Sequence, residues 1–130
     1  MKFYNGRRSA DAVAGEEYLA TELLVVVVED GVERPLAEAP EPADYPFTLS
    51  GGFEWGYGGS GPINLAAAIL YDVLGFVPEA SVVLDFCDNV VAELPRLEFE
   101  LQPTTLHAWL DARLASGSQV ARETTGRQHI

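Results

Sequence analysis

The amino-acid sequence predicts a single α+β domain in which a small N-terminal antiparallel sheet is followed by two to three helices. Three observations point to this class: an unbroken apolar run at Leu23–Val28, two later segments with helical hydrophobic periodicity, and a strictly alternating segment at Leu97–Leu101. No repeat or linker divides the 130 residues, of which 48% are hydrophobic. Residues 1–117 are therefore expected to form the domain, and the polar, aperiodic residues 118–130 a flexible C-terminal tail.

The first part of the chain is expected to supply the sheet. Lys2–Arg8 predicts an opening edge strand, and the valine-rich run Leu23–Val28 predicts a strand that is buried on both faces. Glu29-Asp30-Gly31 has the composition of a turn, so Val32–Leu36 is the expected hairpin partner. Together these segments predict the core of the antiparallel sheet.

The segment after the hairpin mixes loop and strand features. Residues 37–46 contain three prolines among acidic residues, which predicts a loop over the surface. Phe47-Thr48-Leu49 and Phe53-Glu54-Trp55 flank two glycines and are expected to be short strands.

The helices are expected further along the chain. The clearest is capped by Gly61 or Ser60, has Pro62 in its first turn and ends at Gly75, where a left-handed residue typically follows a helix. An amphipathic second helix is expected from about Pro78 to Leu94, and a third, short one from about Thr105 to Ala115. The wide apolar face of the second helix leaves a homodimer or higher oligomer open.

Charge excludes one class of function. Twenty acidic residues against eight Lys and Arg give a formal charge of −12, so direct nucleic-acid binding through a basic face is not expected. No Lys or Arg lies between Pro35 and Pro95, while nine acidic residues do. Two interpretations stay open: a solvated acidic surface, or an acidic face that mimics nucleic acid and docks on a basic protein partner.

The cysteine and histidine content limits the kinds of functional site that the sequence predicts. Cys87, the single cysteine, falls on the apolar side of the second helix and is expected to be a buried structural thiol. His107 and His129 do not suggest a metal site, and no cofactor is expected. With no acid–base or nucleophile set, the sequence predicts no enzyme.

The absence of a long apolar run and of a signal peptide predicts a cytoplasmic protein without membrane contact.

The most unusual segment is Gly51–Pro62, in which six glycines alternate with three aromatic residues directly before a helix. Gly56, Gly58 and Gly61 formally match G-x-G-x-x-G, but a second helix follows where a dinucleotide-binding fold needs a strand. Glycine backbone N–H groups at a helix N-terminus nevertheless favour a bound anion. The alternative is a tight turn whose aromatic side chains fill the core.

On the ligand interpretation, this segment is a candidate binding site. Its aromatic residues would stack on a base or sugar, its glycine N–H groups would hold a phosphate, and arginines from the first strand would neutralise the charge. Glu54 opposes this as an anion within the segment. The candidate ligand-binding residues are Arg7, Arg8, Phe53, Trp55, Tyr57, Gly58, Gly59, Ser60, Gly61 and Asn64.

The same residues resemble a known family. Gly52–Pro62, followed by Leu65-Ala66 and Ile69-Leu70, resembles the hallmark of a small domain family of unknown function that occurs in bacteria, phages and other mobile elements. Tyr4–Arg8 is similar to the opening of that family, and Val90–Pro95 to its later part. The resemblance covers roughly residues 3–115 and brings no settled activity. The acidic loop Glu38–Asp44 and the tail depart from the pattern.

A second likeness is to phage anti-Thoeris proteins, sponges that sequester cyclic ADP-ribose-type signals. Those proteins bind a nucleotide through aromatic, Asn and Arg side chains, and the residues of similar type in this chain are Phe53, Trp55, Tyr57, Asn64, Arg7 and Arg8. The likeness implies a non-enzymatic counter-defence protein that captures a nucleotide-like small molecule in the bacterial host. The alternative hypothesis is an acidic inhibitor, similar to an anti-CRISPR protein, that blocks a basic partner.

Overall fold

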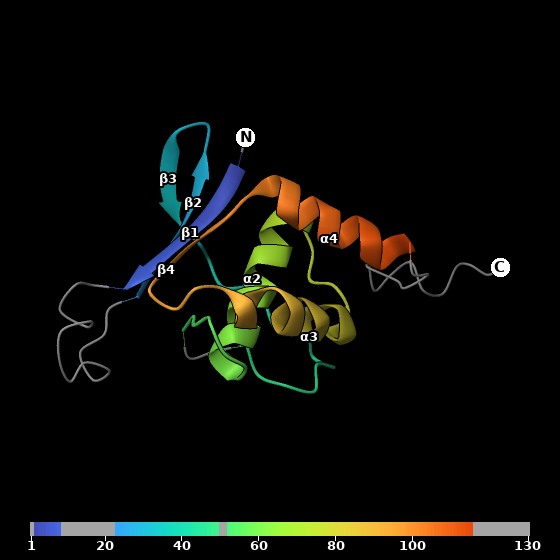
Figure 1. Ribbon diagram of the computed structural model, residues 1–130. Coiled ribbons are helices and arrows are strands. Elements are labelled where there is room, and N and C mark those ends of the chain that lie inside the picture. The colour runs from blue at the N-terminus through green and yellow to red at the C-terminus, as the bar shows by residue number, and fades with distance from the viewer. Residues whose placement is uncertain (1, 9–22, 50–51, 116–130) are drawn as a thin grey trace.

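The computed structural model describes residues 2–8, 23–49 and 52–115, and it shows an α+β domain with helices to one side of a sheet (Figure 1). The sheet has four antiparallel strands in the order β3-β2-β1-β4. Its strands are β1 (Lys2–Arg8), β2 (Leu23–Glu29), β3 (Val32–Pro35) and β4 (Glu98–Leu101). The helices are α2 (Ser60–Leu74), α3 (Ala80–Asn89), the 3-10 turn η2 (Val91–Glu93) and α4 (Pro103–Ala115). The predicted fold class is confirmed, and the predicted tail lies outside the described residues.

The first strand is central in the sheet, so the prediction of an edge strand is wrong. β1 pairs with β2 along its whole length and with β4 from Tyr4 to Arg7. A glycine makes this second pairing possible: a Cβ on Gly6 would lie 2.2 Å from the ring of Phe99. Sequence reasoning missed it because β4 is a four-residue strand that follows all the residues of α2 and α3.

The hairpin of β2 and β3 forms as predicted. Asp30 and Gly31 both have positive φ, 53° and 83°, the conformation of a type I′ turn, which matches the twist of the two strands. The central valines of β2 are buried, as predicted for a strand covered on both faces, whereas Leu24 at its start is 42% exposed.

The two short strands expected at residues 47–49 and 53–55 are not present; both segments are irregular. Their backbone groups bond to side chains rather than to a neighbouring strand: Leu49 N–H donates to Glu41 Oε1 at 2.8 Å, and Trp55 N–H to Glu54 Oε1 at 3.2 Å. These carboxylates take the place of a strand partner.

The helices follow their capping residues closely. α2 ends where predicted, with Gly75 in a left-handed conformation and its N–H bonded to Tyr71 O. α3 is shorter than predicted, because Val90 leaves the helical conformation (φ −124°) and only the turn η2 follows. α4 begins at Pro103, slightly earlier than expected. None of the helices in the described part is long and apolar enough to span a membrane.

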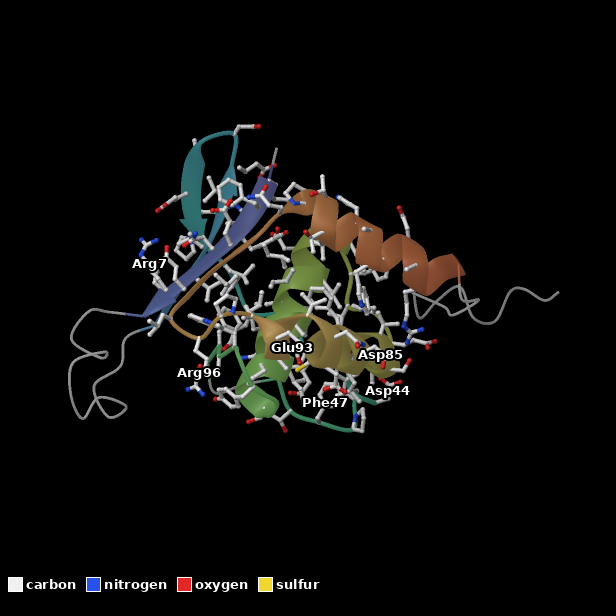
Figure 2. The ribbon with its side chains drawn as sticks, viewed as in Figure 1. Arg7, Asp44, Phe47, Asp85, Glu93 and Arg96 are labelled. Atoms are coloured by element: carbon white, nitrogen blue, oxygen red, sulfur yellow. The ribbon has the colours of Figure 1, made fainter. Side chains whose placement is uncertain are left out.

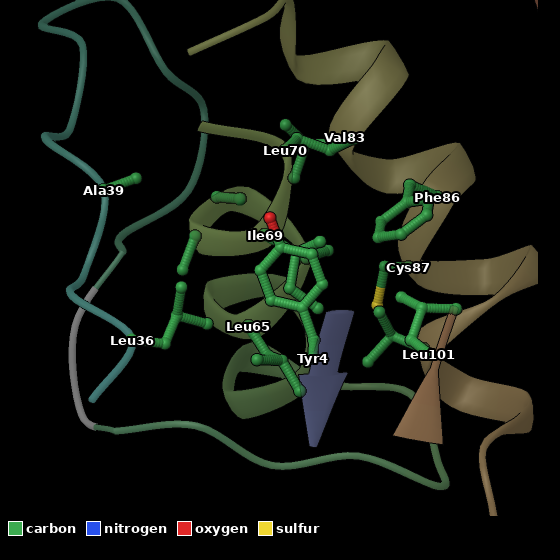
Figure 3. Close-up of a cluster of buried hydrophobic side chains, with 14 of the residues drawn as sticks. Tyr4, Leu36, Ala39, Leu65, Ile69, Leu70, Val83, Phe86, Cys87 and Leu101 are labelled. Carbon is green, nitrogen blue, oxygen red and sulfur yellow. The ribbon is translucent and has the colours of Figure 1, made fainter. Parts of the chain in front are cut away.

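The core surrounds α2, whose residues Leu65–Leu70 are all fully buried. Figure 3 shows Tyr4 from β1 and Leu101 from β4 on one side of this helix, with Phe86 and Cys87 from α3. A helix that is buried on several sides fixes the position of whatever precedes its N-terminus.

Candidate functional site

The segment of residues 52–61, called the glycine loop below, leads directly into α2, and its tryptophan belongs to the core. Trp55 is 0% exposed, and its Nε1 donates to the backbone oxygen of Pro95 at 3.0 Å. Its ring meets Phe99 edge-on, with 5.0 Å between centroids. The expectation that Trp55 stacks on a ligand is therefore corrected: both the ring and its polar group are already occupied inside the protein.

The predicted asparagine is also internal. Asn64 is fully buried, and its Nδ2 donates to Gly52 O at 2.9 Å and to Glu38 Oε2 at 3.2 Å. Asn64 Oδ1 is buried with no hydrogen-bond partner. The side chain thus ties the start of the glycine loop to the acidic loop from inside, instead of presenting an amide at the surface.

Two glycines let the loop pass close to its neighbours. Gly56 has φ 88°, and a Cβ there would lie 2.6 Å from Arg96 Cγ. A Cβ on Gly61 would lie 2.8 Å from Glu54 Cβ. Larger residues would push Gly56 away from Arg96 and Gly61 away from Glu54, so the two glycines allow these charged side chains to lie close to the loop backbone.

The tip of the loop, by contrast, is open. Tyr57 is 40% exposed, and Gly58, Gly59 and Ser60 are exposed beside it. The guanidinium carbon of Arg96 lies over the Tyr57 ring, 5.2 Å from its centroid, which is a cation–π distance. We call these five residues the loop tip.

The loop tip contains the N-terminus of α2. Gly59 is the N-cap, no side chain caps the helix, and the first turn holds no acidic residue. The N–H groups of Ser60 and Gly61 lie in the first turn, where the helix provides no internal acceptor and the helix dipole is positive. The half-buried Glu54 lies next to Gly61, and its Oε1 accepts the Trp55 N–H. Both a cation, Arg96 over Tyr57, and an anion, Glu54 next to Gly61, therefore lie near this N-terminus.

Beneath the tip lies the thiol of Cys87, which is buried as predicted. Burial and the nearby charge of Asp88 raise the pKa of Cys87 to about 11, although the Gly59 N–H bonded to it lowers the value. The group stays a thiol at neutral pH, so it supports the loop and is not a nucleophile.

The structure places Arg7, one of the two predicted arginines, away from the glycine loop. Arg7 lies on the face of the sheet opposite Tyr4 and the core, where its Nη1 donates to Asn5 Oδ1 at 3.3 Å (Figure 2). Because side chains alternate along a strand, Arg7 does not reach the glycine loop, contrary to expectation. The side chain of Arg8 lies outside the described residues, and Phe53 is half-buried against the core.

The cation at the loop is Arg96, which sequence reasoning missed. It follows Pro95 in the connection to β4, far from Tyr57 in the sequence, and no spacing rule links the two. The one available cue was that a lone Arg stands directly after the segment without cations.

Several acidic residues have internal partners. Glu38 accepts from Asn64, Glu41 from the Leu49 N–H, and Asp85 forms an ion pair with Arg113 at 2.8 Å. Within the described ranges, no group of three or more His, Cys, Asp and Glu side chains is arranged to hold a metal ion.

Comparison with known proteins identifies one family. The family model described as a family of unknown function, DUF6166, matches residues 4–112, a range that includes the whole glycine loop and Arg96. No curated protein and no solved structure matches the chain.

Proposed function

The chain belongs to the DUF6166 family of unknown function, and we propose that it is a non-enzymatic binding protein that captures a phosphate-bearing, nucleotide-type small molecule at the loop tip. The aromatic ring of Tyr57 would contact the base or sugar. Arg96 and the N–H groups at the start of α2 would hold the phosphate.

One observation carries this proposal: Arg96 lies over an exposed tyrosine beside a helix N-terminus that has no side-chain cap. An aromatic surface, a guanidinium and first-turn N–H groups are the three kinds of group that nucleotides contact in proteins. These three kinds of group lie together at one exposed point. Packing does not require this arrangement, because Trp55 and Asn64 already hold the loop in place.

The same groups support binding rather than catalysis. A guanidinium keeps its proton at physiological pH, and backbone N–H groups donate hydrogen bonds without transferring a proton. The nearby Cys87 is buried and remains protonated. Sequestration of a signalling nucleotide during phage counter-defence is the biological role that fits such a site, and it rests on the likeness in residue type to the anti-Thoeris sponges.

Calorimetric titration with ADP-ribose tests the site, with adenosine as the probe that lacks phosphate. We expect ADP-ribose to bind more tightly than adenosine, and R96M to weaken ADP-ribose binding about tenfold through loss of a charge-assisted contact. R7M is the matched control, since it removes the same charge from an exposed arginine on the other face of the sheet. Equal losses in R96M and R7M, or equal binding of both probes, would refute the site.

An acidic inhibitor of a basic protein is the second candidate. The observation in its favour is the absence of Lys and Arg between Pro35 and Pro95, a region in which Asp88 and Glu93 are exposed. It ranks second because five of the other acidic groups there have partners within the chain: Glu38, Glu41, Glu54, Asp72 and Asp85. It predicts a complex that weakens steeply with salt and is lost in D88N/E93Q; a salt-insensitive complex would exclude it.

A further inference from the structure

A second candidate site lies at the opposite end of α2 from the glycine loop. A pocket of about 320 Å³ opens between the start of β1, the last turns of α2 and the first turns of α4. It is lined by Lys2, Tyr4, Val73, Pro103, Leu106 and His107. Because α2 has 15 residues and rises about 1.5 Å per residue, this pocket and the loop tip are about 20 Å apart.

The lining has an apolar part and a polar part. Val73, Pro103 and Leu106 form apolar walls, with Leu106 buried and Val73 half-buried. The polar side chains are those of Lys2, Tyr4 and the exposed His107, and the Tyr4 hydroxyl already donates to Asp72. A pocket with apolar walls and a few convergent polar groups is the usual form of a small-molecule site.

A network behind the pocket holds Lys2 in place. The Asp72 carboxylate accepts from Tyr4 Oη at 2.6 Å and Arg34 Nη2 at 3.1 Å, and it lies 3.0 Å from Lys2 Nζ. Lys2 Nζ also donates to the backbone oxygen of Asp72, at 3.4 Å. An ammonium has three N–H donors, so one remains after these two contacts. A side chain that is already held loses little entropy when a ligand binds to it.

The charges of the network are balanced. Lys2 and Arg34 supply two positive charges, while Asp72 and Glu29 supply two negative ones. No acidic residue stands in the first turn of α4, which lines the same pocket. None of the residues that line the pocket is acidic, so a ligand meets the remaining ammonium N–H of Lys2. The balanced network offers no surplus of cations that would favour a dianion such as a phosphate monoester.

We propose that this pocket binds a small monocarboxylic acid with an apolar body. Its carboxylate accepts the remaining N–H of Lys2, and its body packs against Val73, Pro103 and Leu106. The volume lies at the lower end of the range for ligand pockets, about 300–1,000 Å³, which fits a molecule of amino-acid size and excludes a dinucleotide. The site is independent of the loop tip, so either can fail without the other.

An NMR titration of the full chain with phenylacetate tests the proposal, with phenylacetamide as the neutral counterpart and phenyl phosphate as the dianion. We expect the backbone amide signals of Val73, Leu106 and His107 to shift most. We also expect phenylacetate to bind about tenfold more tightly than phenylacetamide, because the hydrogen bond to Lys2 is charge-assisted. Shifts centred on the glycine loop, or tighter binding of phenyl phosphate, would overturn the proposal without any variant.

A pair of variants isolates Lys2. K2M is expected to remove the preference for phenylacetate over phenylacetamide. R34M also removes one positive charge, together with another partner of Asp72. Because Arg34 does not line the pocket, R34M should keep the preference for phenylacetate within twofold. Equal behaviour of K2M and R34M would show that general charge, rather than a contact with Lys2, governs binding, and the proposal would be wrong.

Discussion

Trp55 shows how one residue type is compatible with two opposite roles. Among glycines and before a helix, an aromatic ring suits either a stacking surface or a core filler, and composition does not distinguish them. In the structure its indole N–H reaches Pro95 O, and its ring meets Phe99. The contact with Phe99 identifies Trp55 as a core residue. Phe99 lies on β4, the last strand of the sheet in sequence order.

This burial gives a clear expectation for W55A. Truncating a fully buried tryptophan removes its apolar contacts and leaves a cavity, so the free energy of unfolding should fall by about 3–5 kcal/mol. Urea denaturation followed by circular dichroism measures the change. Y57A is the control at the exposed tip, and it should cost less than about 1 kcal/mol. If W55A were as stable as the wild type but had lost ligand binding, this account would be wrong, and Trp55 would contact the ligand at the surface.

At the same scale, Arg96 is the positive charge that the structure places beside the glycine loop, and sequence reasoning did not identify it. Arg7 and Arg8 were the candidates on the condition that they come across from the first strand, but alternation along β1 puts Arg7 on the other face. The side chain of Arg8 lies outside the described residues. Arg96 is brought to Tyr57 by the close approach of Gly56. A contact between two loops depends on tertiary packing, for which the sequence contains no local pattern.

Among the elements, α2 is the one that local sequence determines best. Its ends follow from a glycine N-cap, a proline in the first turn and a left-handed Gly75, and the structure confirms both within a residue or two. The hairpin of β2 and β3 was equally predictable, since Asp30-Gly31 suits a type I′ turn. Each of these elements is specified by residues adjacent in the sequence.

Elements that depend on distant partners were not predictable in the same way. The central place of β1 requires β4, and the irregular course of residues 47–49 depends on the Glu41 carboxylate. α3 ends early at Val90, although its apolar periodicity continues beyond that residue. In each case a tertiary contact or a local backbone change overrides the hydrophobic pattern.

The link between α2 and the sheet gives a pH-dependent expectation. Burial raises the pKa of Asp72, but hydrogen bonds from Tyr4, Lys2 and Arg34 outweigh it, and the net pKa is lowered. A carboxyl whose pKa is lower in the folded state stabilises the fold above its unfolded pKa, about 3.9. That contribution is lost as the pH falls through the folded value.

D72N should therefore lower the free energy of unfolding by about 1–3 kcal/mol at pH 7, as measured by urea denaturation. The difference from the wild type should shrink below about pH 4, as the pH falls toward the lowered pKa of the folded wild-type carboxyl. D85N is the matched control, because it removes a more exposed ion pair with Arg113 and should cost less than about 1 kcal/mol. A difference between D72N and wild type that stays constant from pH 7 to pH 3 would contradict this account.

Across the whole molecule, the charged residues are distributed unevenly. The segment from Pro35 to Pro95 has no Lys or Arg, whereas the described cations lie on the sheet strands, at Arg96 and on α4. Arg34 and Arg113 are paired with Asp72 and Asp85. Arg96 follows this acidic segment directly in the sequence. On the proposed function, this local contrast, rather than the net charge of −12, favours an anion at the loop tip.

Mass spectrometry of the purified full chain, first native and then after heat denaturation, tests the central claim most directly. We expect the native wild-type protein to carry, or to take up from a nucleotide panel that includes ADP-ribose, one phosphate-bearing small molecule that heat releases. R96M prepared in parallel should show only the mass of the chain. A wild-type protein that stays free of ligand across the panel, or an R96M protein that binds the same molecule equally well, would contradict the account.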